Sequence, residues 1–184
     1  MPRHWWPTVE SVCAVIEGQQ EWPATSPQSN GAFTPLDVDR HQDLALVVGY
    51  GPTRLNDDLV LGVDAFHGLE KGQWKHLGGA GSGTPLEQRQ QLSKGRQELH
   101  VRVGGSAGEF LLEERPQYSY KVFLCGPEVA NVRVQRSHGI RTADVTSGPG
   151  WLGILWTPDD PATVSAFTAD GTQTFTWTLP PSDV

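Results

Sequence analysis

The chain has 184 residues, a mass of 20.1 kDa and a net charge of −7, from 14 basic and 21 acidic residues. Leu, Ile, Val and Phe supply 43 residues, enough for a packed core, and this composition excludes a coiled coil, a collagen-like chain and a long disordered chain. No run of Lys or Arg breaks the acidic balance, so we expect no nucleic-acid partner.

The apolar stretches are far shorter than the roughly 20 residues of a membrane-spanning helix, so we expect no membrane association. They are also too short for the apolar region of a secretory leader, which favours a cytoplasmic protein. Cys13 and Cys125 lie far apart and form no zinc-type pair. Two buried thiols are the simplest interpretation, and a disulfide or a catalytic thiol are the alternatives.

The N-terminal segment predicts one helix over residues 8–22, because its apolar residues recur at helical spacing and share one face. Residues 23–35 are rich in Pro, Ser and Thr and read as a linker. The apolar face of the predicted helix consists of Val9, Val12, Cys13 and Ile16.

After the linker the apolar pattern changes to period two, which predicts strands over residues 44–50 and 59–66. Residues 67–97 are ambiguous. They contain a Gly-rich run over residues 78–83, which we expect to be a flexible loop, and a polar stretch over 85–97 that could carry a short helix.

Short strands separated by turn-forming residues continue to the C-terminus. The run Gly104–Gly108 predicts a hairpin turn between strands at 99–103 and 109–113. In the last strand, Phe175 and Trp177 alternate with threonines, so the two kinds of side chain should lie on opposite faces. The other predicted strands are 118–125, 130–136, 140–146, 151–156, 163–168 and 172–179.

This spacing of short strands predicts a mainly β fold, an antiparallel Ig-like β-sandwich with one N-terminal helix. We divide the chain into the helix and linker, residues 1–35, and a β-sandwich body, residues 36–184. The body could also consist of two parts, 36–116 and 117–184. We favour one continuous body because no linker composition separates them.

The stretch 118–179 resembles a β-sandwich module of uncharacterised actinobacterial proteins. The resemblance rests on turn motifs, among them Gly-Pro-Glu-Val-Ala-Asn-Val-Arg-Val from Gly126 and the Ala-Asp-Gly that ends at Gly171. An excess of Arg over Lys, 10 to 4, is in keeping with such an origin. The resemblance covers about a third of the chain, and it implies a fold but no activity and no site residues.

Gly104–Gly108 also matches the G-x-S-x-G pattern, in which α/β-hydrolases hold a nucleophilic serine on a sharp turn. Ser106 would be that nucleophile, with His138 the one histidine downstream. No Asp lies between the two and the chain lacks a parallel-sheet pattern, so a plain hairpin turn is the favoured interpretation and we assign no catalytic residue.

Four potential metal ligands alternate along one short segment, where a strand would project all four from one face. Three carboxylates and an imidazole could hold a hard or borderline cation, but a solvated approach to the next strand is the favoured interpretation. No cofactor fingerprint accompanies them, so we predict no cofactor. The four residues are Asp37, Asp39, His41 and Asp43.

Seven tryptophans are unusual for this length, and an exposed cluster of them could stack on sugars or on a partner. Trp151, Trp156 and Trp177 fall in strands and are expected in the core. The remaining four lie in less regular segments and are the candidate ligand-binding residues, unless they cover a sheet face or edge. They are Trp5, Trp6, Trp22 and Trp74.

The sequence therefore favours a non-enzymatic binding or protein-interaction module with a protein partner. An acidic protein that neutralises a basic partner, as immunity proteins do, would be one version of it. The alternatives are a binder of a small, carbohydrate-like ligand that uses exposed Trp residues, and a hydrolase that uses Ser106. The oligomeric state is left open.

Overall fold

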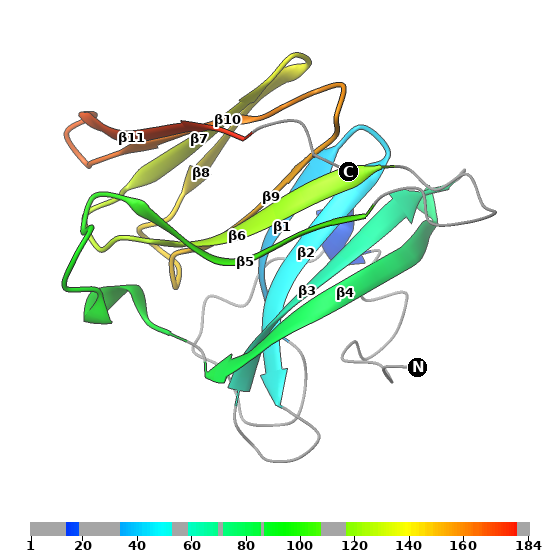
Figure 1. Cartoon of the computed structure of the whole chain (residues 1–184), viewed down its shortest axis with the longest axis horizontal. Coiled ribbons are helices and arrows are strands. Elements are labelled where there is room, and N and C mark those ends of the chain that lie inside the picture. Colours follow the sequence, from blue (N-terminus) through cyan, green and yellow to red (C-terminus); the bar gives the residue numbers. More distant parts are fainter. Residues whose placement is uncertain are drawn as a thin grey trace. The chain divides into compact units, whose positions relative to one another are not determined.

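The computed structural model describes residues 14–18, 34–52, 59–69, 72–85, 87–107 and 117–179. The chain forms two compact units, Met1–Leu86 and Glu87–Val184. Their strands make three antiparallel sheets, so the predicted mainly β, antiparallel fold is confirmed (Figure 1). In the described residues, no helix has both the length and the apolar character needed to cross a membrane.

The first unit contains one four-stranded sheet in which neighbours in sequence pair in the order β1-β2-β3-β4. Residues 14–16 form a single helical turn, the described part of the helix predicted over 8–22. Ile16 of this turn packs with Phe66 and Trp74 on one face of the sheet. The strands are β1 (Thr34–His41), β2 (Leu44–Pro52), β3 (Leu59–Gly68) and β4 (Trp74–Pro85).

The Gly-rich run 78–83 is not the flexible loop that we predicted, because it lies inside β4 and pairs with β3. A Cβ atom on Gly79 would stand 2.3 Å from Oδ1 of Asp64 and 2.6 Å from the carbonyl oxygen of Val63. The missing side chain therefore leaves the space in which the Asp64 carboxylate lies.

The second unit is a sandwich of two antiparallel sheets with strand orders β5-β6-β9 and β11-β10-β7-β8 (Figure 1). A short 3₁₀ turn, η2 (Arg89–Gln91), precedes it. Its strands are β5 (Leu99–Ala107), β6 (Tyr118–Cys125), β7 (Asn131–Arg136), β8 (Gly139–Asp144), β9 (Trp151–Trp156), β10 (Thr163–Phe167) and β11 (Gln173–Thr178).

The boundary between the units falls between Leu86 and Glu87. Strand β5, which lies within 36–116 in the two-part alternative, pairs along its whole length with β6. The predicted hairpin turn at Gly104–Gly108 is wrong for the same reason, because residues 104–107 continue β5 opposite the first residues of β6.

The core of the second unit lies between its two sheets and is built from alternate residues of their strands. Phe123 and Ile154 from one sheet and Val132 and Val164 from the other have no exposed surface. Cys125 is buried in this core, as expected for a structural thiol, and Cys13 lies outside the described residues.

The end of this sandwich is closed by a buried cation. Arg89 is 5% exposed and donates hydrogen bonds to the carbonyl oxygens of Val145, Gly126 (2.8 Å) and Val129 (2.5 Å). One side chain thereby satisfies carbonyl groups in two separate loops. The segment before β5 is thus tied to the body of the unit.

Candidate functional site

Of the four tryptophans predicted to bind a ligand, Trp5, Trp6 and Trp22 lie outside the described residues. Trp74 is 8% exposed and begins strand β4. Its indole N–H donates to the Glu17 carboxylate at 2.9 Å, and the Arg40 guanidinium carbon lies 5.3 Å from the ring centroid. Trp74 therefore holds the 14–18 turn against the sheet and presents no open aromatic surface.

The four predicted metal ligands do not share one strand face. β1 ends at His41, and Asp43 belongs to the following turn, where it bonds to His67 at 2.7 Å. Asp39 and His41 are buried within the unit. Among the described residues, no group of three or more His, Cys, Asp or Glu side chains is placed to hold a metal ion, and Asp37 is not joined to such a group.

Ser106 lies in β5, exposed to solvent and opposite Ser119. His138 bonds instead to Ser137 and, at 3.2 Å, to Asp160, and both contacts use the same ring nitrogen, Nδ1. A nucleophile–base–acid relay needs the serine on one ring nitrogen and the acid on the other. The contacts of His138 therefore hold the turn at residues 137–138. Asp160 also accepts a hydrogen bond from the Ser137 amide at 2.8 Å.

The four-stranded sheet of the second unit has one face toward the core and one away from it. Val132, Val134, Val164 and Ala166 point inward, so the residues between them in β7 and β10, and their partners in the neighbouring strands, point outward. We call this set the outer face. It consists of Asn131, Arg133, Gln135, Ile140, Thr142, Asp144, Thr163, Ser165, Phe167, Thr176 and Thr178.

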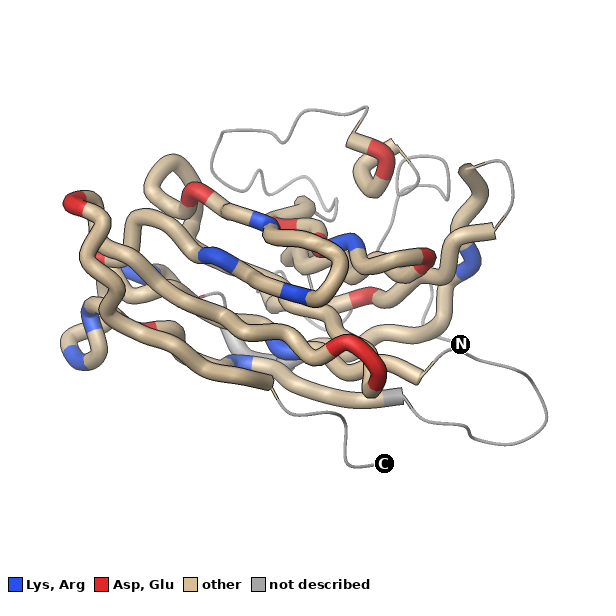
Figure 2. Tube along the Cα trace, turned by 90° about the horizontal axis from the view of Figure 1, so that it is seen from above, with Lys and Arg blue, Asp and Glu red and all other residues tan. Residues whose placement is uncertain are grey.

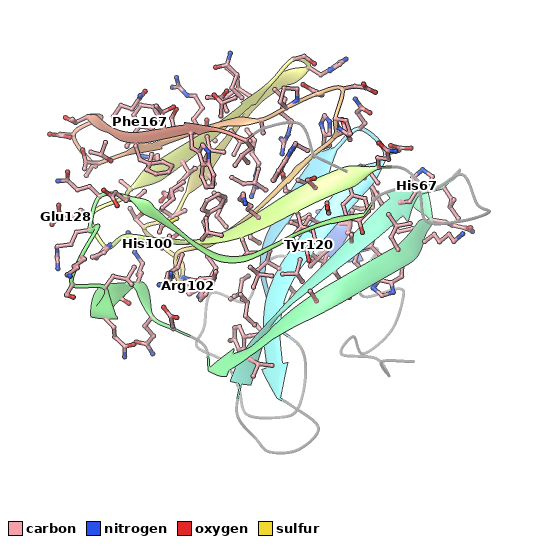
Figure 3. The ribbon with its side chains drawn as sticks, viewed as in Figure 1. His67, His100, Arg102, Tyr120, Glu128 and Phe167 are labelled. Atoms are coloured by element: carbon pink, nitrogen blue, oxygen red, sulfur yellow. The ribbon has the colours of Figure 1, made fainter. Side chains whose placement is uncertain are left out.

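Side chains on the outer face are held by short contacts with one another. The hydroxyl groups of Thr163 and Thr178 lie 3.2 Å apart, as do those of Ser165 and Thr176. The Arg133 guanidinium carbon lies 5.2 Å from the centroid of Phe167, which is labelled in Figure 3. Cross-strand pairs of this kind hold the side chains of the surface in place.

One large apolar side chain interrupts this polar surface. Ile140 is 60% exposed at the start of β8. Arg and aromatic side chains are enriched at protein interfaces, and the outer face carries one of each, together with this exposed aliphatic group.

The two charged side chains of the outer face, those of Arg133 and Asp144, make different contacts. The Asp144 carboxylate accepts hydrogen bonds from the hydroxyl and the amide of Thr146 at 2.6 and 2.8 Å. The hydroxyl bond is the main cause of a lowered Asp144 pKa, with the amide bond second. Asp144 is therefore engaged in its own turn, while the Arg133 guanidinium lies over a ring. Elsewhere in the described chain, acidic and basic positions are interspersed (Figure 2).

Sequence reasoning missed the outer face, although its threonines gave a signal. The alternation in the last strand correctly separated Phe175 and Trp177, which pack against the core, from the threonines. The meeting of Arg133 with Phe167 depends on the register between β7 and β10, 34 residues apart, and no local pattern reports it.

Comparison with family models, with curated proteins and with solved structures finds no match for the chain. The outer face is therefore described from its own geometry alone.

Proposed function

We propose that the chain is a non-enzymatic protein-interaction module that binds a protein partner through the outer face. The observation that supports this most is the composition of that face: an exposed Ile140 and a stacked Arg133–Phe167 pair among hydroxyl side chains bonded to each other. A cytoplasmic place of action is part of the proposal.

The chemistry of the face defines the partner that would fit it. An apolar group would cover Ile140, and a carboxylate would meet the Arg133 guanidinium, which is already held over the Phe167 ring. Short Ser and Thr side chains lose little rotamer entropy when a partner covers them. The entropic cost of covering the hydroxyl side chains around Ile140 and Arg133 is therefore small. This partner is neutral to acidic at the contact, in contrast to the basic partner that the net charge suggests.

The experiment compares charge substitutions on the two sheets of the same unit. The partner would be captured from an extract of the source cells with the wild-type chain, purified, and titrated against Ile140→Asp and Arg133→Glu. Each variant should weaken binding about tenfold or more, because each places a negative charge on a side chain that the proposed partner covers.

Val101→Asp is the matched control, since Val101 is 40% exposed on β5 of the other sheet. This variant should bind as the wild type does, and circular dichroism should show that all three variants stay folded. Equal loss of binding in Val101→Asp and Ile140→Asp would contradict the assignment of the outer face.

A further inference from the structure

The sandwich of the second unit has four edge strands, and three of them are bordered by charged side chains that discourage pairing with another chain. Edge strands expose backbone donors and acceptors, and charged side chains or bulges normally protect them. At β9, the Arg136 side chain donates to the Leu155 carbonyl at 2.8 Å, and Arg141 donates to that of Gly153 at 3.1 Å. Two side chains thus occupy acceptors along this strand.

Two further edges are protected by charge and irregularity. Strand β5 contains a register shift between Val101 and Val103, and Arg102 beside it forms a salt bridge with Glu87 at 2.7 Å. Strand β8 carries both Arg141 and Asp144 within six residues. Neither edge can accept a second strand without burying or displacing a charged side chain.

The fourth edge, β11, has a register shift only near its start, where Phe175 and Gln173 pair with consecutive residues of β10, and it is regular from Phe175 onward. Its six residues, Gln173–Thr178, contain no charged residue and no proline, and they are rich in the β-branched and aromatic side chains that favour strands. In the described part of the chain, β11 pairs with β10 on one side and with no strand on the other.

The pairing with β10 shows which backbone groups of β11 face the open side. The Leu179 amide donates to the Ala162 carbonyl at 2.8 Å, so this pair is hydrogen-bonded across the two strands. Alternate pairs then repeat the pattern, and Trp177 turns its backbone groups toward Val164. The N–H and C=O groups of Thr176 and Thr178 are therefore directed to the open side.

We infer that β11 pairs with β11 of a second copy of this chain, antiparallel and around a two-fold axis at Trp177. In this register Thr176 of each copy faces Thr178 of the other. Each of these two Thr–Thr pairs is joined by two backbone hydrogen bonds. The two Trp177 side chains become direct cross-strand neighbours, an arrangement that favours aromatic pairs. Trp177 is only partly buried in the single chain, so it has surface left to contribute.

The charge of the chain limits where two copies can meet. Two copies that each carry −7 repel one another, but β11 contains no acidic residue, and the Lys121 ammonium lies 5.2 Å from the centroid of the Trp177 ring. A two-fold axis uses both open edges at once, and the Arg141 and Asp144 side chains on β8 prevent further growth from the opposite edge. The assembly therefore closes as a dimer and does not extend into a fibre.

The first test is sedimentation of the full chain over a range from about 1 µM to about 1 mM, because a contact this small gives a weak dimer. The wild type should change from monomer to dimer within that range. Thr176→Lys should shift the transition at least tenfold upward, because it places two cations beside the axis.

Thr142→Lys, the same change on β8 of the same sheet, should sediment as the wild type does. A wild type that stays monomeric throughout, or an equal effect of the two lysine variants, would overturn the inference. Ile140→Asp and Arg133→Glu should leave the dimer intact, so loss of partner binding and loss of dimerisation can be told apart.

A second test fixes the register. A mixture of Thr176→Cys and Thr178→Cys chains should form a disulfide-linked dimer under mild oxidation, because facing residues in a hydrogen-bonded pair have Cα atoms about 5.5 Å apart. A mixture of Thr176→Cys and Thr142→Cys should form no more cross-link than the wild type. Equal cross-linking in the two mixtures would contradict the pairing.

Discussion

The two units of the chain build and bury their β-sheets with different kinds of residue. In the second unit, apolar side chains alternate along most strands and two sheets enclose a core that includes Phe123 and Val164. In the first unit, Asp39 and His41 are buried in β1 and a Gly-rich run lies inside β4. An alternating apolar pattern therefore predicts strands that are built from large side chains. It does not predict a strand such as β4, which contains a Gly-rich run.

The units also differ in how they hold polar side chains against the backbone. The second unit surrounds the Arg89 guanidinium with main-chain carbonyls. The first unit fits the Asp64 carboxylate over Gly79, where it accepts a hydrogen bond from His76 at 2.8 Å. The Arg89 hydrogen bonds join separate loops, whereas the Asp64–His76 hydrogen bond joins the neighbouring strands β3 and β4. We therefore expect the loss of each to have an effect of different size.

The largest expected effect follows from Arg89→Met, which keeps the length of the side chain but removes its donors. Three buried carbonyl groups would lose their partner, so we expect the free energy of unfolding of the second unit to fall by about 3–5 kcal/mol. Chemical denaturation measures this loss, and hydrogen exchange read separately in the two units should place it in the second.

Arg96→Met serves as the control for this prediction, because Arg96 forms an exposed salt bridge with Glu128 at 2.7 Å. It should cost less than about 1 kcal/mol. If the two variants unfold at the same denaturant concentration, Arg89 does not close the sandwich as described.

A smaller effect is expected from Gly79→Ala in the first unit. The new methyl group would meet the carbonyl oxygen of Val63 at 2.6 Å and displace the Asp64 side chain, so we expect a loss of about 1–3 kcal/mol. Gly81→Ala in the same strand would contact only the Leu61 carbonyl oxygen at 3.7 Å, an ordinary distance, and should be neutral within about 0.5 kcal/mol. Thermal unfolding of both variants measures the difference, and equal values would show that β4 does not need glycine at position 79.

The smallest effect concerns pH. The hydrogen bond to Asp64 raises the pKa of His76 above its ordinary value of 6.5, against an opposing effect of burial and with a further contribution from the Asp64 charge. Because the folded-state pKa is the higher one, the stabilisation is fully present below pH 6.5 and is lost as the pH rises through the folded-state pKa.

The His76 side chain is about half exposed, so we expect this loss to stay below about 1 kcal/mol. Denaturant midpoints between pH 5.5 and 8.5 should therefore decline slightly in the wild type, and Asp64→Asn should remove that part of the decline. A decline of the same size in Asp64→Asn would assign it to other groups.

Much of the second unit could be predicted from the sequence, and particular residues show why. Strand β9, Trp151–Trp156, is apolar at nearly every position and is buried throughout, so its limits were predicted correctly. Strand β6, Tyr118–Cys125, was also predicted with its observed limits. In both cases local composition and neighbouring turn residues were sufficient.

The remaining features depend on contacts between distant residues. Arg89 lies in a polar stretch that predicted at most a short helix, and its partners follow 37 to 56 residues later. Gly79 lies in a run typical of loops, and only its position opposite Asp64 makes it part of a strand. The outer face requires the registers of three strand pairs, which the sequence does not report.

The most direct test of the proposed function is hydrogen exchange of the wild-type chain with and without its captured partner. Strands β7, β8, β10 and β11 together carry the outer face, so their amides and the adjoining turns should become protected on binding. Protection confined to the other sheet of the second unit, or to the first unit, with unchanged exchange in these four strands, would contradict the assignment.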